Sequence, residues 1–165
     1  MKKQIGNFEI RPIFLKDNES IKAIVLSTLK EHGAIGDGFA SSDPELNQMF
    51  QAYQAPKTKY FVLLQNNEVI GGAGIGPLLN TSKEWCELQK MYFLPIARGK
   101  GLGMQLMNLC LEAAQEFGYK YCYLETLDNM QIAQSLYNKV GFIQVENRRG
   151  GTGHSGCPVF MELEL

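Results

Sequence analysis

A glycine-rich stretch, RGKGLG, occupies residues 98–103, between an apolar run and a long amphipathic run. Glycine is a poor helix former, so three glycines where a helix is expected to begin need a physical reason. A helix N-terminus offers free N–H groups, and glycine lets an anion approach the backbone because it has no Cβ. Arg98 and Lys100 add positive charge nearby. The stretch therefore indicates a phosphate or pyrophosphate site; a tight turn that merely joins a strand to a helix is the alternative.

Two common nucleotide-binding motifs do not match this stretch. The spacing that starts at Gly99 and Gly101 puts Met104 where a dinucleotide fingerprint needs its third glycine. A P-loop also fails, because Gly101 follows the Gly99-Lys100 pair where serine or threonine is required. A second glycine-rich run, GGAGIG, fits neither motif and is interpreted as the end of a strand packed beside something bulky.

The composition describes an ordinary globular protein and excludes several other classes. The 165 residues are 45% hydrophobic and 20% charged, and residues 1–165 are expected to form a single domain. A net charge of −1 gives no reason to expect a nucleic-acid partner. No apolar run approaches the roughly 20 residues of a membrane span, and no signal-peptide pattern is visible. Four irregularly spaced cysteines favour reduced thiols, so we expect a cytoplasmic protein without a membrane partner.

Apolar spacing and turn residues predict the elements that position the glycine-rich stretch. The expected strands are residues 8–13, 59–65, 69–76, 85–93, 120–126, 142–147 and 158–165. The expected helices are one capped by Asp17, a short one within residues 44–53, one over residues 102–117, and one opened by an Asp128–Gln131 capping box and ended by Gly141. This order predicts an α+β or mixed α/β fold, with six or seven strands in a mixed, mostly antiparallel sheet and helices on both faces.

Two motifs carry a resemblance to a known family. The R-x-x-G-x-G pattern of residues 98–103 resembles the acyl-CoA pyrophosphate loop of the GNAT superfamily of N-acetyltransferases. The surrounding residues 87–107 are similar to the fourth strand, loop and third helix of that family. A second stretch, AQSLYNKVGF at residues 133–142, resembles the family pattern A-x-x-L-Y-x-x-x-G-F. The strand order fits the family from about residue 8 to the C-terminus.

The resemblance implies acetyl-CoA as the acetyl donor and assigns residues to its binding. In the family, the strands equivalent to residues 85–93 and 120–126 splay apart and admit the pantetheine arm, while the pyrophosphate lies on the glycine-rich loop. The implied binding residues are Met91, Tyr92, Phe93, Arg98, Gly99, Lys100, Gly101, Leu102, Gly103, Met104 and Met130. Met130 stands where many members carry asparagine, so a hydrogen bond to CoA is either absent or supplied differently.

The resemblance also implies two proton transfers. Tyr137 matches the family tyrosine and is the predicted general acid, with a core aromatic as the alternative. Glu87 and Glu125 are both candidates for the general base, acting through a water, and either one is alternatively a structural strand residue. Strand alternation predicts that Glu87 shares a face with Gln89, Met91 and Phe93, and that Glu125 shares one with Tyr121 and Tyr123.

The acceptor side of the site is less defined by the sequence. Residues 33–56 are irregular and are expected to form one wall, where Asp37, together with Asp43 and Glu45, would attract a cationic amine; solvated loop charges are the alternative. His154, in the loop TGHSGC, is predicted to contact the substrate or relay a proton, with a structural histidine as the alternative. A metal site is not expected, because the chain has only one other histidine, His32.

The resemblance implies an N-acetyltransferase. It would transfer an acetyl group from acetyl-CoA to a primary amine, of a small molecule or a protein, by direct attack in a ternary complex. A non-catalytic acyl-CoA sensor and a nucleotide-binding protein remain the alternatives. The sequence leaves open a homodimer that pairs through the final strands.

Overall fold

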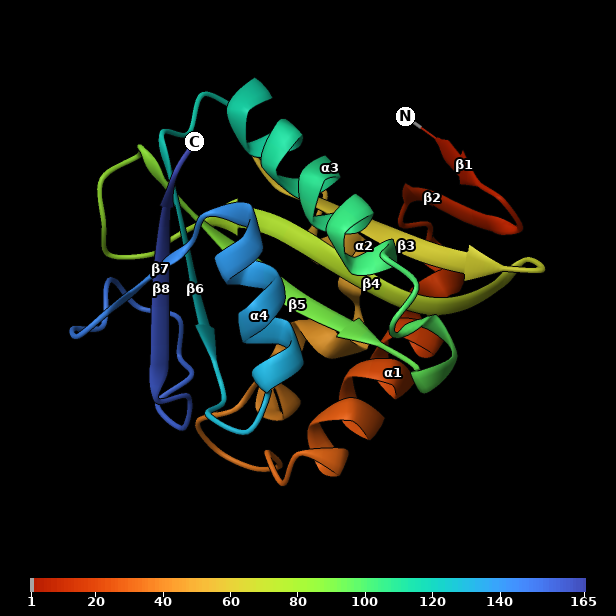
Figure 1. Ribbon diagram of the computed structural model, residues 1–165, viewed down its shortest axis with the longest axis horizontal. Helices are drawn as coiled ribbons and strands as arrows, with labels where there is room; N and C mark the ends of the chain where they lie inside the picture. Colours follow the sequence, from red (N-terminus) through yellow and green to blue (C-terminus); the bar gives the residue numbers. More distant parts are fainter. Residues whose placement is uncertain (1) are drawn as a thin grey trace.

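The computed structural model describes residues 2–165, which form one eight-stranded sheet with helices on both sides (Figure 1). The strands are β1 (Lys3–Ile5), β2 (Phe8–Pro12), β3 (Lys59–Gln65), β4 (Glu68–Pro77), β5 (Trp85–Phe93), β6 (Tyr121–Thr126), β7 (Ile143–Val145) and β8 (Val159–Glu164). The helices are α1 (Asn18–Glu31), α2 (Met49–Ala52), α3 (Leu102–Glu116) and α4 (Gln131–Val140). Short 3₁₀ turns lie at Leu15–Asp17, Ala40–Ser42, Pro44–Asn47 and Pro95–Ala97.

The sheet has the order β1-β2-β3-β4-β5-β6-β8-β7. Neighbouring strands are antiparallel except for the β5–β6 pair, which is parallel. The expected α+β fold with a mixed, mostly antiparallel sheet is therefore confirmed. The sheet has eight strands instead of six or seven because β1 was not anticipated. Its three residues are too few to show an alternating pattern, and it is added to the edge through a tight turn at Gly6 (φ +57°).

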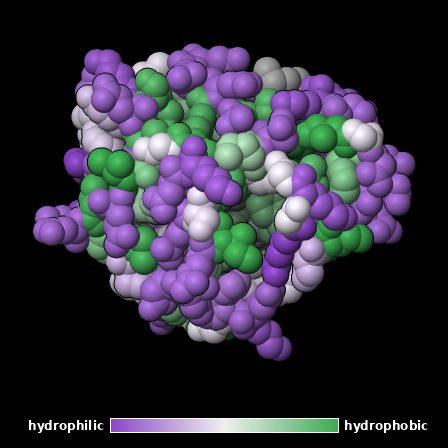
Figure 2. Space-filling view, in the orientation of Figure 1, coloured by the Kyte–Doolittle hydropathy of each residue, from purple (hydrophilic) through white to green (hydrophobic). Residues whose placement is uncertain are grey.

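Two hydrophobic layers hold the helices to the sheet. Helices α3 and α4 cover one face, shown toward the viewer in Figure 1. Helices α1 and α2 pack on the opposite face around a second cluster of buried side chains. On the face with α3 and α4, hydrophobic residues appear as separate areas among hydrophilic ones (Figure 2). The prediction that helices cover both faces is confirmed.

A β-bulge in β5 decides which way the side chains of the site point. Gly72 pairs with Tyr92 and Gly74 pairs with Gln89, so two residues of β5 face one residue of β4. Lys90, at the bulge, has a φ of +48°, and its carbonyl accepts a hydrogen bond from the Tyr60 hydroxyl (2.8 Å). The inserted residue reverses the alternation of the strand beyond it.

The prediction that Glu87, Gln89, Met91 and Phe93 share one face is therefore wrong. Glu87 and Gln89 face the α1–α2 side, where the Tyr53 hydroxyl donates to Gln89. Met91 and Phe93 instead pack on the α3 side with the cluster beneath that helix. The bulge thus separates the polar half of β5 from its apolar half.

The second glycine-rich run lies inside β4, against two tyrosines. A Cβ at Gly74 would approach Tyr60 to 2.5 Å and Tyr53 to 2.8 Å, and a Cβ at Gly72 would approach Tyr60 to 2.6 Å. These glycines let the large rings pack directly on the strand, as the sequence predicted.

Neither predicted aspartate cap forms. Asp17 lies at the N-cap position of α1, but its carboxylate accepts hydrogen bonds from Arg11 (2.7 and 2.9 Å) and from the Phe14 N–H (2.7 Å). Helix α4 begins after Met130, and Asp128 is an exposed loop residue. A buried arginine attracts the first carboxylate more strongly than the helix N–H groups do.

Candidate active site

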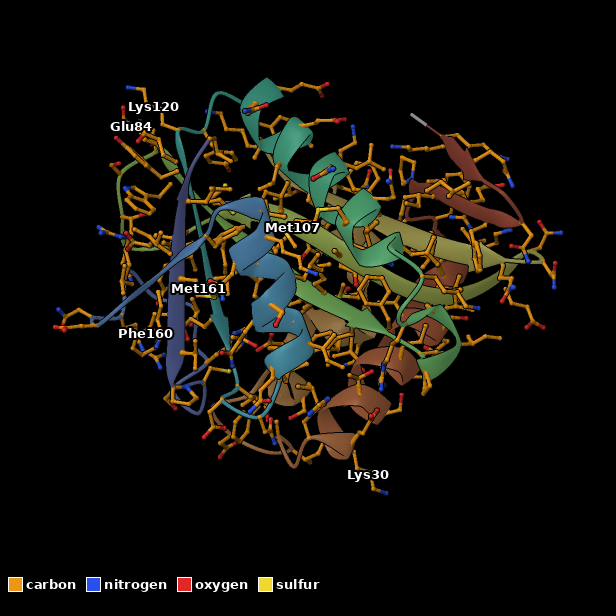
Figure 3. The ribbon with its side chains drawn as sticks, in the orientation of Figure 1. Lys30, Glu84, Met107, Lys120, Phe160 and Met161 are labelled. Atoms are coloured by element: carbon orange, nitrogen blue, oxygen red, sulfur yellow. The ribbon has the colours of Figure 1, made fainter. Side chains whose placement is uncertain are left out.

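A cleft opens where β5 and β6 separate. The parallel pairing joins Trp85–Glu87 to Tyr121–Tyr123, and the strands then continue apart to Phe93 and Thr126 (Figure 1). At the closed end, the side chains of Glu84 and Lys120 (Figure 3) form an ion pair, and the Lys120 N–H donates to the Glu84 carbonyl (2.9 Å). A cavity lies in the gap, lined by both strands, α4, the segment after α1 and the loop that carries His154.

The glycine-rich loop lies at the start of α3, after the apolar end of β5. Gly99 and Gly101 have φ angles of +71° and +73°, a conformation that favours glycine. Within residues 2–165, no atom lies within 4 Å of a Cβ built on either glycine, so this side of the loop is open to a ligand. The first N–H groups of a helix have no partner within the helix, and here they belong to residues 101–104. An anion fits this arrangement.

Gly103 has a different role from the two glycines before it. A Cβ at this position would lie 3.0 Å from Leu136 of α4 and 3.6 Å from Met91 of β5. The glycine therefore allows α3 to pack closely against α4 and the strand. The neighbouring Leu102 is buried in the core and offers only its N–H to a ligand, and Met104 is half-buried.

The two basic side chains of the loop differ in their surroundings. The Arg98 guanidinium donates to both carboxylate oxygens of Glu31 (2.7 Å each) and to the Phe93 carbonyl (3.0 and 3.1 Å). It braces the loop against α1 and β5, and Glu31 balances its charge. Lys100 is exposed, with its Nζ 5.3 Å from the centroid of the Phe8 ring. The backbone N–H groups are therefore the groups of the loop best placed to receive an anion.

The remaining predicted CoA residues lie along the cleft. Met91 and Tyr92 line the cavity from β5, while Phe93 packs toward Gly103. Met130 lines the cavity from the residue before α4, and its sulfur accepts a hydrogen bond from the Thr126 hydroxyl (3.8 Å).

Tyr137 points into the cavity from α4. Its ring packs edge-on against Phe142, with the centroids 6.0 Å apart. Within residues 2–165 its hydroxyl forms no hydrogen bond, so it is free to donate to a ligand. Burial raises the pKa of Tyr137 above its ordinary value, and the hydroxyl therefore stays protonated at neutral pH.

Glu87 has a buried carboxylate that neighbouring side chains hold by hydrogen bonds. The Gln89 amide donates to its Oε2 (2.8 Å), and the Tyr53 hydroxyl donates to Gln89 Oε1 (2.8 Å). Burial raises the pKa of Glu87 to about 7, against the opposing effect of the Gln89 hydrogen bond. This carboxylate can therefore take up and release a proton near neutral pH.

Glu125 lines the same cavity from β6. Its Oε1 accepts a hydrogen bond from Tyr123 (2.8 Å), which agrees with the predicted shared face, and Arg148 Nη1 lies 3.0 Å from its Oε2. Glu87 pairs with Tyr123 across the two strands, so the carboxylates of Glu87 and Glu125 line the same part of the cleft.

A charged cluster lies at one side of the cavity, which its members Lys90 and His154 line. Lys90 Nζ lies 2.7 Å from Asp43 and 2.8 Å from Glu45, and His154 Nε2 lies 3.0 Å from Asp43. Burial disfavours the imidazolium, but the Asp43 hydrogen bond and charge prevail and raise the pKa of His154. Asp37 is exposed and does not line the cavity. The cluster connects residues 33–56 and the TGHSGC loop to the β5 bulge.

Sequence reasoning did not single out Lys90, Gln89, Tyr53 or Arg148. The available signal was a lysine inside an otherwise apolar strand, since a buried lysine needs anionic partners. The partners of Lys90 lie more than 40 residues away along the chain, and no local pattern identifies them.

Other chemistries find less support in the site. Cys157 lines the cavity, but burial raises its pKa to about 11, so its thiol is not a nucleophile at neutral pH. Residues 2–165 contain no group of three or more metal-ligating side chains placed to hold a metal ion. Over the same residues, no helix is long and apolar enough to cross a membrane.

Comparisons with known proteins identify the family. Residues 26–142 match the sequence model of the acetyltransferase (GNAT) family. The chain is 41% identical over 157 residues, 94% of each chain, to YjgM of Escherichia coli (strain K12), an uncharacterised N-acetyltransferase. It is 27% identical over 141 residues to the aminoalkylphosphonate N-acetyltransferase of Salmonella typhimurium (strain LT2), covering 82% of this chain and 85% of the relative.

Solved structures share the fold. An acetyltransferase of the GNAT family from Staphylococcus aureus Mu50 superimposes with a TM-score of 0.83 at 19% identity, covering 95% of this chain and 98% of the other. The yncA protein of Salmonella typhimurium, whose structure contains its cofactor acetyl-CoA, has a TM-score of 0.76 at 20% identity, with 96% and 94% covered. With a family match over most of its length and a 41% identical relative, the chain belongs to the GNAT family of acetyltransferases and is an acyltransferase.

Proposed function

We propose that this acyltransferase moves an acetyl group from acetyl-CoA to a primary amine of a small molecule, by direct attack in a ternary complex. The observation that carries the proposal is the pair of Glu87 and Tyr137 on one cavity between the splayed strands. One is a carboxylate whose pKa is raised to about 7, and the other is a hydroxyl held protonated by burial. Such a pair supplies a general base and a general acid at neutral pH.

The residues of the cleft fit acetyl-CoA. The open loop at Gly99 and Gly101 and the free N–H groups of residues 101–104 suit its pyrophosphate, and the separated edges of β5 and β6 suit its pantetheine arm. When bound, acetyl-CoA supplies a thioester carbonyl that an amine can attack. The yncA protein of Salmonella typhimurium, whose structure contains acetyl-CoA, supports this assignment.

The side chains of the cavity divide the proton transfers between them. A primary amine is mostly protonated near pH 7, so Glu87 takes a proton from it, directly or through a water, before attack. The Tyr137 hydroxyl gives a proton to the departing thiolate, and the second proton that the amine nitrogen loses as the amide forms restores the hydroxyl. Gln89 and Tyr53 hold the Glu87 carboxylate in place for this exchange.

A small-molecule acceptor is favoured over a protein. The charged cluster of Asp43, Lys90 and His154 joins two loops beside the cavity, and Lys90 and His154 line it. The aminoalkylphosphonate N-acetyltransferase of Salmonella typhimurium is named for a small amine acceptor, which supports the same class here.

Acetyl-CoA binding is tested by thermal unfolding of the wild type and of Gly101→Glu. Saturating acetyl-CoA, at about a hundred times Kd, should add roughly 2.7 kcal/mol of stability to the wild type. For a domain of this size that raises Tm by roughly 5–10 °C. The new carboxylate of Gly101→Glu repels the pyrophosphate, so its Tm should not respond to acetyl-CoA.

Gly118→Glu is the matched control for this experiment. Gly118 also has a positive φ (+81°) and open space around its Cβ, but it follows α3 at the end away from the loop. Both variants should lose similar stability, while Gly118→Glu keeps the full response to acetyl-CoA. A wild type without a shift, or a Gly101→Glu variant with a normal one, contradicts the assignment of the loop.

A further inference from the structure

The Glu125 carboxylate is buried, with none of its side chain exposed, yet one of its oxygens lacks a hydrogen-bond donor within residues 2–165. Oε1 accepts from the Tyr123 hydroxyl (2.8 Å), whereas Oε2 has Arg148 Nη1 at 3.0 Å without the alignment of a hydrogen bond. Buried polar atoms are nearly always hydrogen-bonded. An unsatisfied carboxylate oxygen beside a cavity therefore indicates a donor that a ligand provides.

Neighbouring residues hold the Glu125 carboxylate in one orientation. The Tyr123 hydroxyl accepts a hydrogen bond from the Arg149 N–H (3.2 Å) and donates its own proton to Glu125 Oε1. Arg148 cannot swing freely toward Oε2, because it also donates to the carbonyls of His154 (3.0 Å) and Cys157 (3.1 Å). Oε2 thus remains an acceptor site in the wall of the cavity.

Glu125 Oε2 lies away from the position expected for the reacting amine. Glu87 pairs with Tyr123 across β5 and β6, and Glu125 follows two residues later on the same face of β6. An acceptor whose amine lies at Glu87 has its body within reach of Glu125, because both side chains line the same cavity. The second contact therefore falls on the body of the acceptor rather than on its amine.

We propose that Glu125 Oε2 binds a neutral hydrogen-bond donor of the acceptor, a hydroxyl or an amide N–H, and so selects such amines over plain alkylamines. A neutral donor is favoured over a second ammonium because Arg148 already balances the charge of Glu125 and would repel another cation nearby. This inference rests on the proposed function and adds a specificity-determining residue to it.

The test compares amino alcohols and amino acid amides with alkylamines of the same chain length. For the wild type, kcat/KM should be roughly 10- to 100-fold higher for the amino alcohols and amino acid amides than for the alkylamines, mainly through a lower KM. This is the effect expected of a buried hydrogen bond to a charged group. In Glu125→Gln this preference should fall at least several-fold, because the facing amide group is either a donor or a weaker, neutral acceptor. The KM for acetyl-CoA should stay unchanged.

Glu162→Gln is the matched control. Glu162 is paired with Arg149 and lies outside the cavity lining, so the same substitution there should keep the preference. Equal use of both amine classes by the wild type, or an unchanged preference in Glu125→Gln, overturns the inference. So does an equal loss of kcat for all amines in Glu125→Gln, which would make Glu125 the base.

Calorimetric binding of the same amines to the protein saturated with CoA separates this inference from the proposed function. Preferential binding of amino alcohols that is weakened in Glu125→Gln supports the Glu125 contact even if no amine is acetylated. Acetylation without any preference for the second donor leaves the proposed function in place and refutes the contact.

Discussion

Glu87→Gln is expected to lower kcat/KM for amine acetylation by roughly 10²- to 10⁴-fold, the usual contribution of a general base. Glutamine has nearly the same shape and can keep the contact with Gln89, but it cannot take a proton from the acceptor. Steady-state kinetics with acetyl-CoA and one primary amine measure this effect. Acetyl-CoA binding, followed by thermal shift, should be unchanged.

The pH dependence distinguishes this loss from simple damage to the site. Burial raises the pKa of Glu87 to about 7, and the base acts only when deprotonated. The wild-type kcat/KM should therefore rise with pH through about 7, while Glu87→Gln lacks this limb and keeps only the rise due to the amine itself. The value of kcat/KM rises with pH because the Glu87 carboxyl group is mostly protonated, and therefore inactive as a base, below pH 7. An unchanged limb in the variant assigns the base elsewhere.

Tyr137→Phe is expected to lower kcat by roughly 10²- to 10⁴-fold while leaving acetyl-CoA affinity nearly unchanged. The ring keeps its packing on Phe142, and only the hydroxyl that faces the cavity is lost. Because burial raises the pKa of Tyr137, the wild-type hydroxyl remains a proton donor across the neutral range.

Tyr119→Phe provides the control for removal of a tyrosine hydroxyl. Tyr119 is buried, and its hydroxyl donates to the Lys57 carbonyl (3.0 Å) outside the cavity, so this variant should keep kcat. Equal kcat values for Tyr137→Phe and the wild type would remove Tyr137 from the mechanism.

Local motifs predicted the parts of the site that depend on neighbouring residues in the chain. The place of the glycine-rich loop at the start of α3 and the place of Tyr137 on α4 follow from patterns within ten residues. The sequence therefore anticipated the open loop, the helix behind it and the tyrosine beside the cleft.

The faces of β5 could not be predicted in the same way. The bulge at Lys90 is held by the Tyr60 hydroxyl and by Asp43 and Glu45, all from distant segments. Simple alternation therefore put Met91 on the wrong face. Contacts between distant segments decide a bulge, and a single sequence does not show them.

Charged side chains were misjudged for a related reason. Arg98 pairs with Glu31, a partner that the sequence did not indicate, and Asp17 pairs with Arg11 instead of capping α1. Among the three acidic candidates of the irregular segment, Asp43 and Glu45 reach Lys90 while Asp37 stays exposed. The choice of ionic partner depends on the tertiary fold.

The central claim is that this protein acetylates a primary amine with acetyl-CoA. The most direct measurement is the release of the CoA thiol from acetyl-CoA across a panel of small primary amines, with the N-acetyl product identified by mass spectrometry. We expect amine-dependent thiol release with one N-acetyl product formed per thiol, and almost no release from Glu87→Gln. A protein that is stabilised by acetyl-CoA but releases no thiol with any amine would contradict the account and act as an acyl-CoA sensor.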